Sequence, residues 1–129
     1  MFDHVGFGVS DLARSRSFYE RALAPLGIAV QMEVTSEQTG GYEGLGFGPP
    51  GRPLFWIGTG EALRGSLHVA FAAADRSAVD AFHRAALDAG GRDNGAPGLR
   101  PHYHPNYYGA FVLDPDGHNI EAVCHSPGA

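Results

Sequence analysis

Two histidines recur at the same place in two copies of one sequence segment. The segment from Asp3 to Asp11 aligns without a gap with the segment from Leu67 to Asp75, and this offset of 64 residues pairs His4 with His68. Imidazole groups transfer protons near neutral pH and bind metal ions. Two related histidines on two related strands therefore imply one site built across a pseudo-twofold axis.

A carboxylate near the end of the chain can join these histidines. The run Asp114-Pro115-Asp116-Gly117 predicts a turn, since proline presets the first turn torsion and glycine tolerates positive φ. The hairpin then continues into a strand over 118–125. Alternation along this strand directs Ile120 and Ala122 to the packed face and Glu121 to the opposite face, where we expect His4 and His68.

The repeat continues beyond the first strand of each copy. Phe18 aligns with Phe82, and Gly27 aligns with Gly91. Each half is predicted to form a strand, a helix capped by an aspartate, and then three strands. The predicted strands of the first half are 2–9, 28–34, 42–48 and 53–58 around a helix over 12–25; those of the second half begin at 67 and continue at 92–95, 107–113 and 118–125.

Small residues flank both histidines. Gly6 and Gly8 share a strand face with His4, and Ala70 and Ala72 share one with His68. A strand in the core would fill these positions with Leu or Ile. We therefore expect this face, which lies away from the helix and is called the open face below, to form an accessible cleft.

A proline-rich stretch separates two of the later strands. It runs from 96 to 106 and contains three prolines, so an ordered loop is expected there rather than a strand or helix. Two histidines outside this stretch, His83 on the second helix and His118 in the turn, are expected at the surface.

Length and charge restrict the class of protein. The 129 residues suffice for one domain with its own core, and the lone Cys124 excludes an intrachain disulfide. The net charge is −5, and the nine basic residues are arginines scattered singly. We expect a cytoplasmic protein that binds neither nucleic acid nor a membrane.

The opening His4-Val-Gly-Phe-Gly-Val-Ser-Asp-Leu, the second histidine at His68 and the closing Asp-Pro-Asp-Gly-His-Asn-Ile-Glu resemble the vicinal oxygen chelate superfamily. This superfamily includes glyoxalase I, bleomycin and fosfomycin resistance proteins and extradiol dioxygenases. The resemblance implies an α+β fold in a single domain (1–129) of two βαβββ modules, module 1 (about 1–60) and module 2 (about 66–125). It also implies a U-shaped metal-binding cleft, often within a dimer.

On the pattern of that superfamily, His4, His68 and Glu121 match the three metal ligands. The chemistry of these residues agrees, because two neutral imidazoles and one carboxylate leave coordination positions open. Such a set suits catalytic zinc or a non-haem iron(II) triad, and manganese, nickel and cobalt are compatible with it. The identity of the divalent metal stays open.

The sequence departs from the glyoxalase I pattern at the fourth ligand. Alignment of the two closing hairpins places Phe55 or Trp56 opposite Glu121, and neither residue can ligate a metal. Glyoxalase I typically has glutamate or glutamine there, so glutathione-dependent isomerisation is disfavoured. Trp56 is instead a candidate substrate-binding residue that would form an aromatic wall.

The segment 100–108 carries the densest group of functional side chains. Arg100 could pair with an anionic group of a substrate, and Asn106 is a second candidate for substrate binding. Extradiol dioxygenases have a tyrosine three residues before the turn where this chain has Phe111, which puts ring cleavage in doubt. The candidate catalytic acids, bases and hydrogen-bond donors are His102, His104, Tyr107 and Tyr108.

Two classes of function follow. The favoured one is a divalent-metal-dependent enzyme of lyase, isomerase or dioxygenase type that acts on a small oxygen-chelating substrate. The alternative is a metal-free protein that binds a drug or metabolite, as bleomycin resistance proteins do. A homodimer is expected in either case, because open half-barrels leave apolar edges that a second copy can cover.

Overall fold

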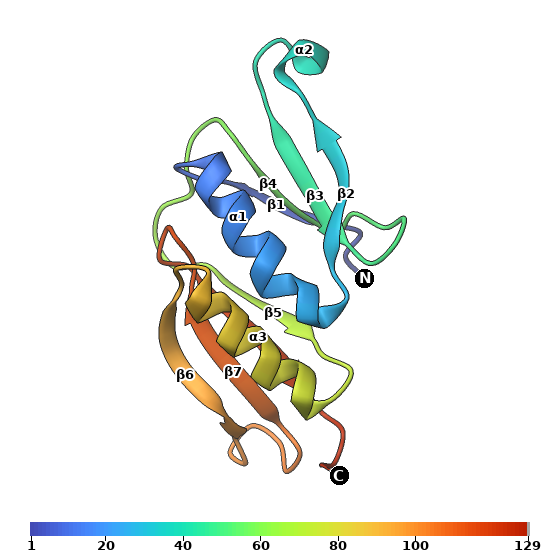
Figure 1. Cartoon of the computed structure of the whole chain (residues 1–129), viewed down its shortest axis with the longest axis vertical. Coiled ribbons are helices and arrows are strands. Elements are labelled where there is room, and N and C mark those ends of the chain that lie inside the picture. Colours follow the sequence, from blue (N-terminus) through green and yellow to red (C-terminus); the bar gives the residue numbers. More distant parts are fainter. Residues whose placement is uncertain (129) are drawn as a thin grey trace.

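Two helices lie side by side in front of two four-stranded sheets in the computed structural model, which describes residues 1–128 (Figure 1). Ala129, the last residue of the predicted domain, lies outside the described residues. The element order confirms the α+β class and the two related modules. Module 1 consists of β1 (Val5–Gly8), α1 (Leu12–Leu23), the 3-10 turn η1 (Ala24–Leu26), β2 (Ala29–Val34), α2 (Ser36–Thr39), β3 (Gly44–Gly48) and β4 (Phe55–Gly58); module 2 consists of β5 (His68–Ala72), α3 (Arg76–Asp88), β6 (Arg92–Leu99), β7 (Tyr108–Leu113) and β8 (Asn119–Cys124).

Both long helices begin at the predicted aspartates. The Asp11 carboxylate accepts a hydrogen bond from the Arg14 N–H at 3.1 Å, and the Asp75 carboxylate accepts one from Ala78 at 2.8 Å. Each bond satisfies a backbone donor that a helix start leaves free. The first helix then tightens into η1 and ends at Gly27, whose φ of +75° suits glycine.

The strand register settles which residue is the counterpart of Glu121. The sheet orders are β1-β4-β3-β2 and β5-β8-β7-β6, with β1 parallel to β4 and β5 parallel to β8. Gly6 lies opposite Trp56, and its repeat counterpart Ala70 lies opposite Glu121. Trp56 therefore takes the position of Glu121 in module 1, whereas Phe55 is fully buried in the core.

The helix-side faces of the two sheets share one hydrophobic core. Phe18 on α1 and Val79 and Phe82 on α3 are fully buried in it, as the helical spacing predicts. Phe55 of module 1 packs edge-on against Phe71 of module 2, with ring centroids 5.1 Å apart. The modules therefore meet through their helix sides, and the open faces are left outside this shared core.

The Asp-Pro-Asp-Gly turn of module 2 is docked on module 1. The Tyr19 hydroxyl donates to the buried Asp114 carboxylate at 2.5 Å, the Ser10 hydroxyl donates to Asp116, and the Arg14 guanidinium donates to the Pro115 carbonyl at 3.0 Å. This docking explains why the expectation of an exposed His118 is wrong. The turn carries His118 under the module junction, where it is 2% exposed and packs edge-on against Phe7.

Two local expectations need correction, and one element was not foreseen. The stretch 96–99 is strand rather than loop, because β6 is an edge strand in which Pro97 is tolerated and two register shifts absorb the irregularity. His83, expected at the surface, is half-buried: its side chain is 13% exposed and its Nε2 lies 3.0 Å from the Asp93 carboxylate. The single turn α2 was not expected; it is held by a reciprocal capping box between Thr35 and Gln38.

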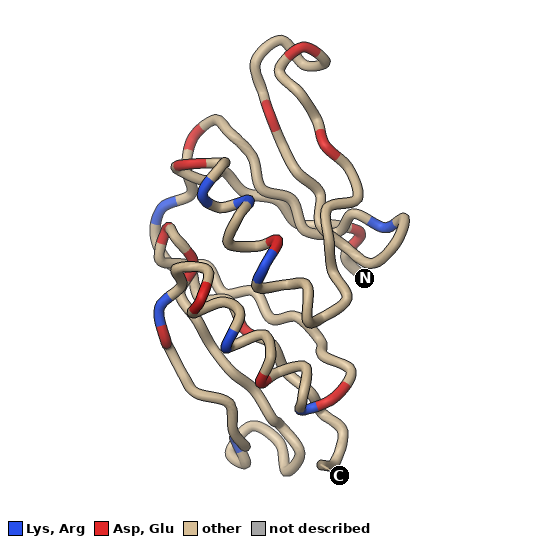
Figure 2. Tube along the Cα trace, viewed as in Figure 1, with Lys and Arg blue, Asp and Glu red and all other residues tan. Residues whose placement is uncertain are grey.

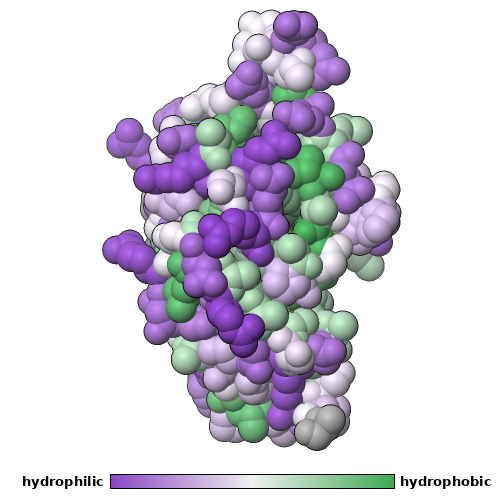
Figure 3. Space-filling view, in the orientation of Figure 1, coloured by the Kyte–Doolittle hydropathy of each residue, from purple (hydrophilic) through white to green (hydrophobic). Residues whose placement is uncertain are grey.

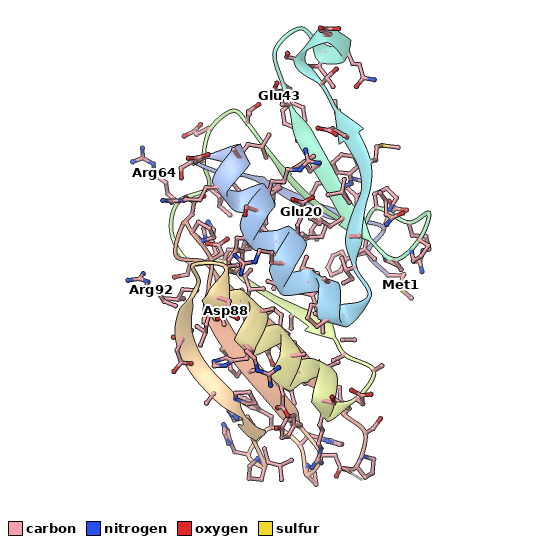
Figure 4. The ribbon with its side chains drawn as sticks, viewed as in Figure 1. Met1, Glu20, Glu43, Arg64, Asp88 and Arg92 are labelled. Carbon is pink, nitrogen blue, oxygen red and sulfur yellow. The ribbon has the colours of Figure 1, made fainter. Side chains whose placement is uncertain are left out.

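Charged residues of both signs are interspersed over the molecule. Figure 2 shows no concentration of arginines on either module among the described residues, and in Figure 4 Arg64 and Arg92 point outward. The face seen in Figure 3 is mostly hydrophilic, with small hydrophobic patches between the polar side chains. None of the described helices has the length and apolar character that crossing a membrane requires.

Candidate functional site

A buried carboxylate meets a histidine on the open face of module 2. Glu121 on β8 is fully buried, and its Oε1 lies 2.7 Å from Nε2 of His68 on the neighbouring strand β5. The His68 side chain remains 53% exposed, so its ring borders solvent. Burial of a carboxylate is costly unless hydrogen bonds or a cation compensate it. The pair therefore holds one nitrogen and one oxygen side by side at the border of solvent.

Tyr107 completes the surroundings of that carboxylate. Its hydroxyl donates a hydrogen bond to Oε2 of Glu121, the oxygen that His68 does not contact. Burial, together with the bond to Glu121, raises the pKa of the Tyr107 phenol well above its usual value. The phenol is therefore protonated at neutral pH and acts as a donor.

His4 stands apart from this group. It precedes β1, is exposed, and its Nδ1 lies 2.7 Å from the Asp3 carboxylate. Among residues 1–128, no group of three or more His, Cys, Asp or Glu side chains is placed to hold a metal ion. One chain thus brings together two of the three predicted ligands, His68 and Glu121.

A cavity of about 840 Å³ is bordered by both repeated histidines. Its walls come from β1, β5 and the segment that joins the modules. Phe2, Val5 and Leu63 line it and are 88%, 39% and 41% exposed. Because β1 and β5 are the terminal strands of their sheets, the cavity is bounded by an exposed apolar rim and by two strand edges that no further strand covers. The β1 edge has one bond to the joining segment, from the Leu63 N–H to the Gly8 carbonyl at 3.0 Å.

The open face of module 1 is a glycine surface covered by two aromatic rings. A Cβ on Gly46 would lie 2.7 Å from the Trp56 ring, and one on Gly58 would lie 2.2 Å from the Tyr42 hydroxyl. Gly44 and Gly58 face each other across β3 and β4 under the Tyr42 ring. The glycines thus let both rings lie against the backbone, with Tyr42 still 44% exposed.

Several side chains of the segment 100–108 contact the segment itself or the neighbouring strands β6 and β7. The Arg100 guanidinium donates to the Ala96 and Gly98 carbonyls, both at 2.8 Å, and lies over the Phe111 ring. His104 Nδ1 accepts a hydrogen bond from the Asn106 N–H, and the His102 ring lies 4.2 Å from that of Tyr103. None of these contacts brings His102, His104 or Asn106 to Glu121.

Tyr107, just before β7, and Tyr108, its first residue, point in different directions. Tyr107 reaches Glu121 on the open face, whereas the Tyr108 hydroxyl donates to Asp80 of α3 at 2.6 Å. The hydrogen bond to Asp80, followed by burial, raises the pKa of Tyr108. Of the four predicted catalytic residues, only Tyr107 contacts a predicted metal ligand.

Tyr42 was missed by reasoning from the sequence. It lies on the open face of module 1 in the same relation to Gly44 as Tyr107 to Gly109 in module 2. The signal was present as Tyr42-Glu43-Gly44 and Tyr107-Tyr108-Gly109, at an offset one residue larger than that of the histidines. An ungapped alignment hides this match.

Comparison with known proteins identifies the family. The model of the Glyoxalase/Bleomycin resistance protein/Dioxygenase superfamily matches residues 1–122, and the chain belongs to this superfamily. A glyoxalase/bleomycin resistance protein from Albidiferax ferrireducens T118 is similar, at 33% identity over 98% of this chain and 99% of that chain, with a TM-score of 0.78. No curated protein sequence matches the chain.

Two further solved structures share the fold at lower identity. An E144Q mutant of glyoxalase I from Zea mays has 24% identity and a TM-score of 0.70, covering 95% of this chain and 46% of the longer Zea mays chain. A glyoxalase/bleomycin resistance protein/dioxygenase family enzyme from Burkholderia phytofirmans PsJN has 19% identity and a TM-score of 0.69, covering 96% of this chain and 98% of that chain. At these identities the likeness extends to the fold only.

Proposed function

We propose that the chain is a subunit of a divalent-metal-dependent enzyme that acts on a small organic substrate able to chelate the metal through two oxygens. The observation that supports this most directly is the 2.7 Å approach of His68 Nε2 to Oε1 of the fully buried Glu121. An imidazole nitrogen and a carboxylate oxygen held side by side suit zinc, iron(II), manganese, nickel or cobalt. The reaction would be of lyase, isomerase or dioxygenase type.

The third ligand in this proposal is His4 of the partner subunit in a homodimer. β1 and β5 each have an edge that no further strand covers, and they are repeat counterparts, so β1 of one copy can lie beside β5 of another and the contact then forms twice. The exposed Phe2, Val5 and Leu63 at the cavity rim would be covered by this contact.

A bound ion supplies Lewis-acid stabilisation of negative charge on a substrate oxygen. The chain itself binds and orients the substrate. In this proposal the half-buried Trp56 ring forms a wall for its apolar part. His102 and His104 of the neighbouring loop are the candidates for moving a proton near the site.

The proposed reaction is not the glutathione-dependent isomerisation of glyoxalase I. Trp56 stands at the repeat counterpart of Glu121 and supplies no oxygen for a metal or a proton. Metal-loaded protein should therefore leave the methylglyoxal–glutathione hemithioacetal unchanged. Efficient conversion of that compound would refute this part of the proposal.

Metal binding and subunit sharing can be tested together. Calorimetric titration with Zn²⁺, Mn²⁺ and Co²⁺ should show tight binding by the parent and its loss in His68→Ala, Glu121→Gln and His4→Ala. Mixing unfolded His4→Ala with unfolded His68→Ala and refolding them together should restore a fraction of tight sites, because a mixed dimer contains one intact set. Refolding His68→Ala alone is the control, and equal binding by all variants would refute the site.

One observation favours the second function, a metal-free binding protein. The three predicted ligands do not meet within one chain, while the aromatic surface of module 1 is formed without a partner. If the parent binds none of the three ions but its Trp56 fluorescence changes saturably with a planar organic ligand, the binding protein is the correct interpretation.

A further inference from the structure

The two oxygens of the Glu121 carboxylate have different partners. Oε1 lies beside His68 Nε2, and Oε2 accepts the hydrogen bond from the Tyr107 hydroxyl. A carboxylate has two oxygens that a metal can bind singly or together. When the Tyr107 phenol bonds one carboxylate oxygen, the other oxygen is the one left to bind a metal. The bond from Tyr107 thus favours metal binding through one carboxylate oxygen over binding through both.

Gly109 makes room for this contact. A Cβ on Gly109 would lie 3.1 Å from the Tyr107 ring and 3.3 Å from Glu121 Oε2, closer than side chains ordinarily approach. The glycine two residues after the tyrosine therefore permits the contact. The Tyr107 side chain passes over β7 at Gly109, which has no side chain, and reaches β8.

Module 1 repeats the tyrosine and the glycine but not the carboxylate. Tyr42 lies over Gly44 as Tyr107 lies over Gly109, and Trp56 stands where Glu121 stands in module 2. Trp56 has no oxygen to accept a bond from Tyr42. The chain thus contains a matched tyrosine in a similar backbone setting that lacks the acceptor.

The surrounding loop holds the Tyr107 ring in place. The Tyr107 carbonyl accepts from the Arg100 N–H at 2.7 Å, and its own N–H donates to the His104 carbonyl at 3.1 Å. The rings of Tyr103 and His125 pack edge-on against it at 5.1 and 5.2 Å. Much of the loop between β6 and β7 thereby fixes one phenol.

We infer that Tyr107 is a positioning residue whose hydroxyl fixes the Glu121 carboxylate, so that the single oxygen Oε1 is presented together with His68 Nε2 to the bound ion. This inference rests on the proposed function for the identity of the ligand. The hydrogen bond itself belongs to the metal-free protein. Its effect on His68 is therefore measurable without any metal.

The test compares Tyr107→Phe with the matched control Tyr42→Phe. Removing a hydrogen bond behind a metal ligand typically weakens metal binding 10- to 100-fold. We expect a loss of about that size for Co²⁺ with Tyr107→Phe and none with Tyr42→Phe. The visible spectrum of bound Co²⁺ should also change in Tyr107→Phe alone, because a released carboxylate can bind through both oxygens.

A second measurement does not depend on metal. The ¹⁵N signals of the His68 ring should shift in metal-free Tyr107→Phe and stay in place in Tyr42→Phe, while circular dichroism shows both variants folded. If the parent binds Co²⁺ and Tyr107→Phe matches it in affinity, spectrum and His68 signals, the inference is wrong and the proposed function stands. If the parent binds no metal, the proposed function fails, and so does the inference that Tyr107 presents Oε1 to a metal ion. A shift of the His68 signals in Tyr107→Phe would then still show that Tyr107 positions His68 and Glu121.

Discussion

Trp56 and Glu121 occupy equivalent positions in the two modules, because each lies directly opposite the residue two positions after the repeated histidine, Gly6 and Ala70 respectively. The strand register establishes this equivalence. One residue is an aromatic ring that covers Gly46, and the other is a buried carboxylate beside His68. The repeated architecture has therefore diverged into an aromatic wall and a polar wall.

This equivalence predicts the effect of a carboxylate in module 1. Trp56→Glu should strengthen Zn²⁺ binding at least tenfold, about 1.4 kcal/mol, because it adds a fourth ligand, a second carboxylate, at the repeat counterpart of Glu121. Trp56→Leu removes the ring without adding a donor and serves as the control. Equal Zn²⁺ affinities of the two variants in calorimetric titration would show that Trp56 does not face the ion.

Removing the Tyr19 hydroxyl should destabilise the chain. Asp114 Oδ1 accepts from the backbone N–H groups of Asp116 and His118, so Tyr19→Phe would leave only Oδ2 of this buried carboxylate without a partner. The expected loss is about 1–3 kcal/mol of unfolding free energy, measured by urea denaturation. Tyr103→Phe, at a position 62% exposed, is the control and should change stability little.

The same contact predicts a loss of stability in alkali. Burial, then the nearby charge of Asp114, raises the pKa of Tyr19 well above 10 in the folded chain. Above about pH 10 the unfolded chain loses this proton while the folded chain keeps it, so unfolding becomes easier as pH rises. Urea midpoints recorded from pH 8 to 11 should fall, and the fall should be shallower in Tyr19→Phe. An equal slope in both proteins would contradict this assignment.

Two neighbouring glycines should differ sharply in their tolerance of alanine. A Cβ on Gly8 would lie 2.0 Å from the Glu61 carbonyl, which is backbone, whereas one on Gly6 would lie 3.2 Å from the Trp56 Cβ. Overpacking of this kind costs about 1–3 kcal/mol. Gly8→Ala should therefore lower the melting temperature markedly and Gly6→Ala only slightly. The opposite order would mean that the backbone of the 59–63 segment can move away from a Cβ at Gly8 at little cost in stability.

Replacing the buried imidazole of His118 at the module junction should not destabilise the protein. Neither ring nitrogen of His118 has a hydrogen-bond partner among the described residues, although the ring is 2% exposed and packs on Phe7. An unpaired buried polar group costs about 1–3 kcal/mol. His118→Phe keeps a ring there and should preserve or raise the melting temperature. A clear fall would indicate that the nitrogens make a bond essential to the junction.

The repeat and the alternation predicted most of the fold because they report local backbone preference and burial. The caps at Asp11 and Asp75, the buried positions of Phe18 and Phe82 and the turn before β8 all follow from neighbours in sequence. Alternation also brought Glu121 to the face of His68.

Relations between distant segments could not be obtained in that way. The docking of the Asp114 turn on Tyr19 buries His118, and this contact joins residues 95 positions apart in the sequence, too far for a local pattern to predict. Pro97 reads as a loop residue until β6 is known to be an edge strand. The separation of His4 from Glu121 depends on how the two modules pack, which no local pattern encodes.

The irregular strand β6 has a consequence for self-association. Its outer edge carries Pro97, which lacks an N–H, and two register shifts that bend the strand away from a regular ladder. Such an edge cannot template a growing stack of strands. The β1–β4 and β5–β8 ladders show no register shift and contain no proline, so the proposed pairing between copies would use the edges of β1 and β5, on the side of the molecule that bears His4 and His68. In the proposed homodimer, the proline-bearing edge of β6 would then stay outside the contact and resist fibril formation.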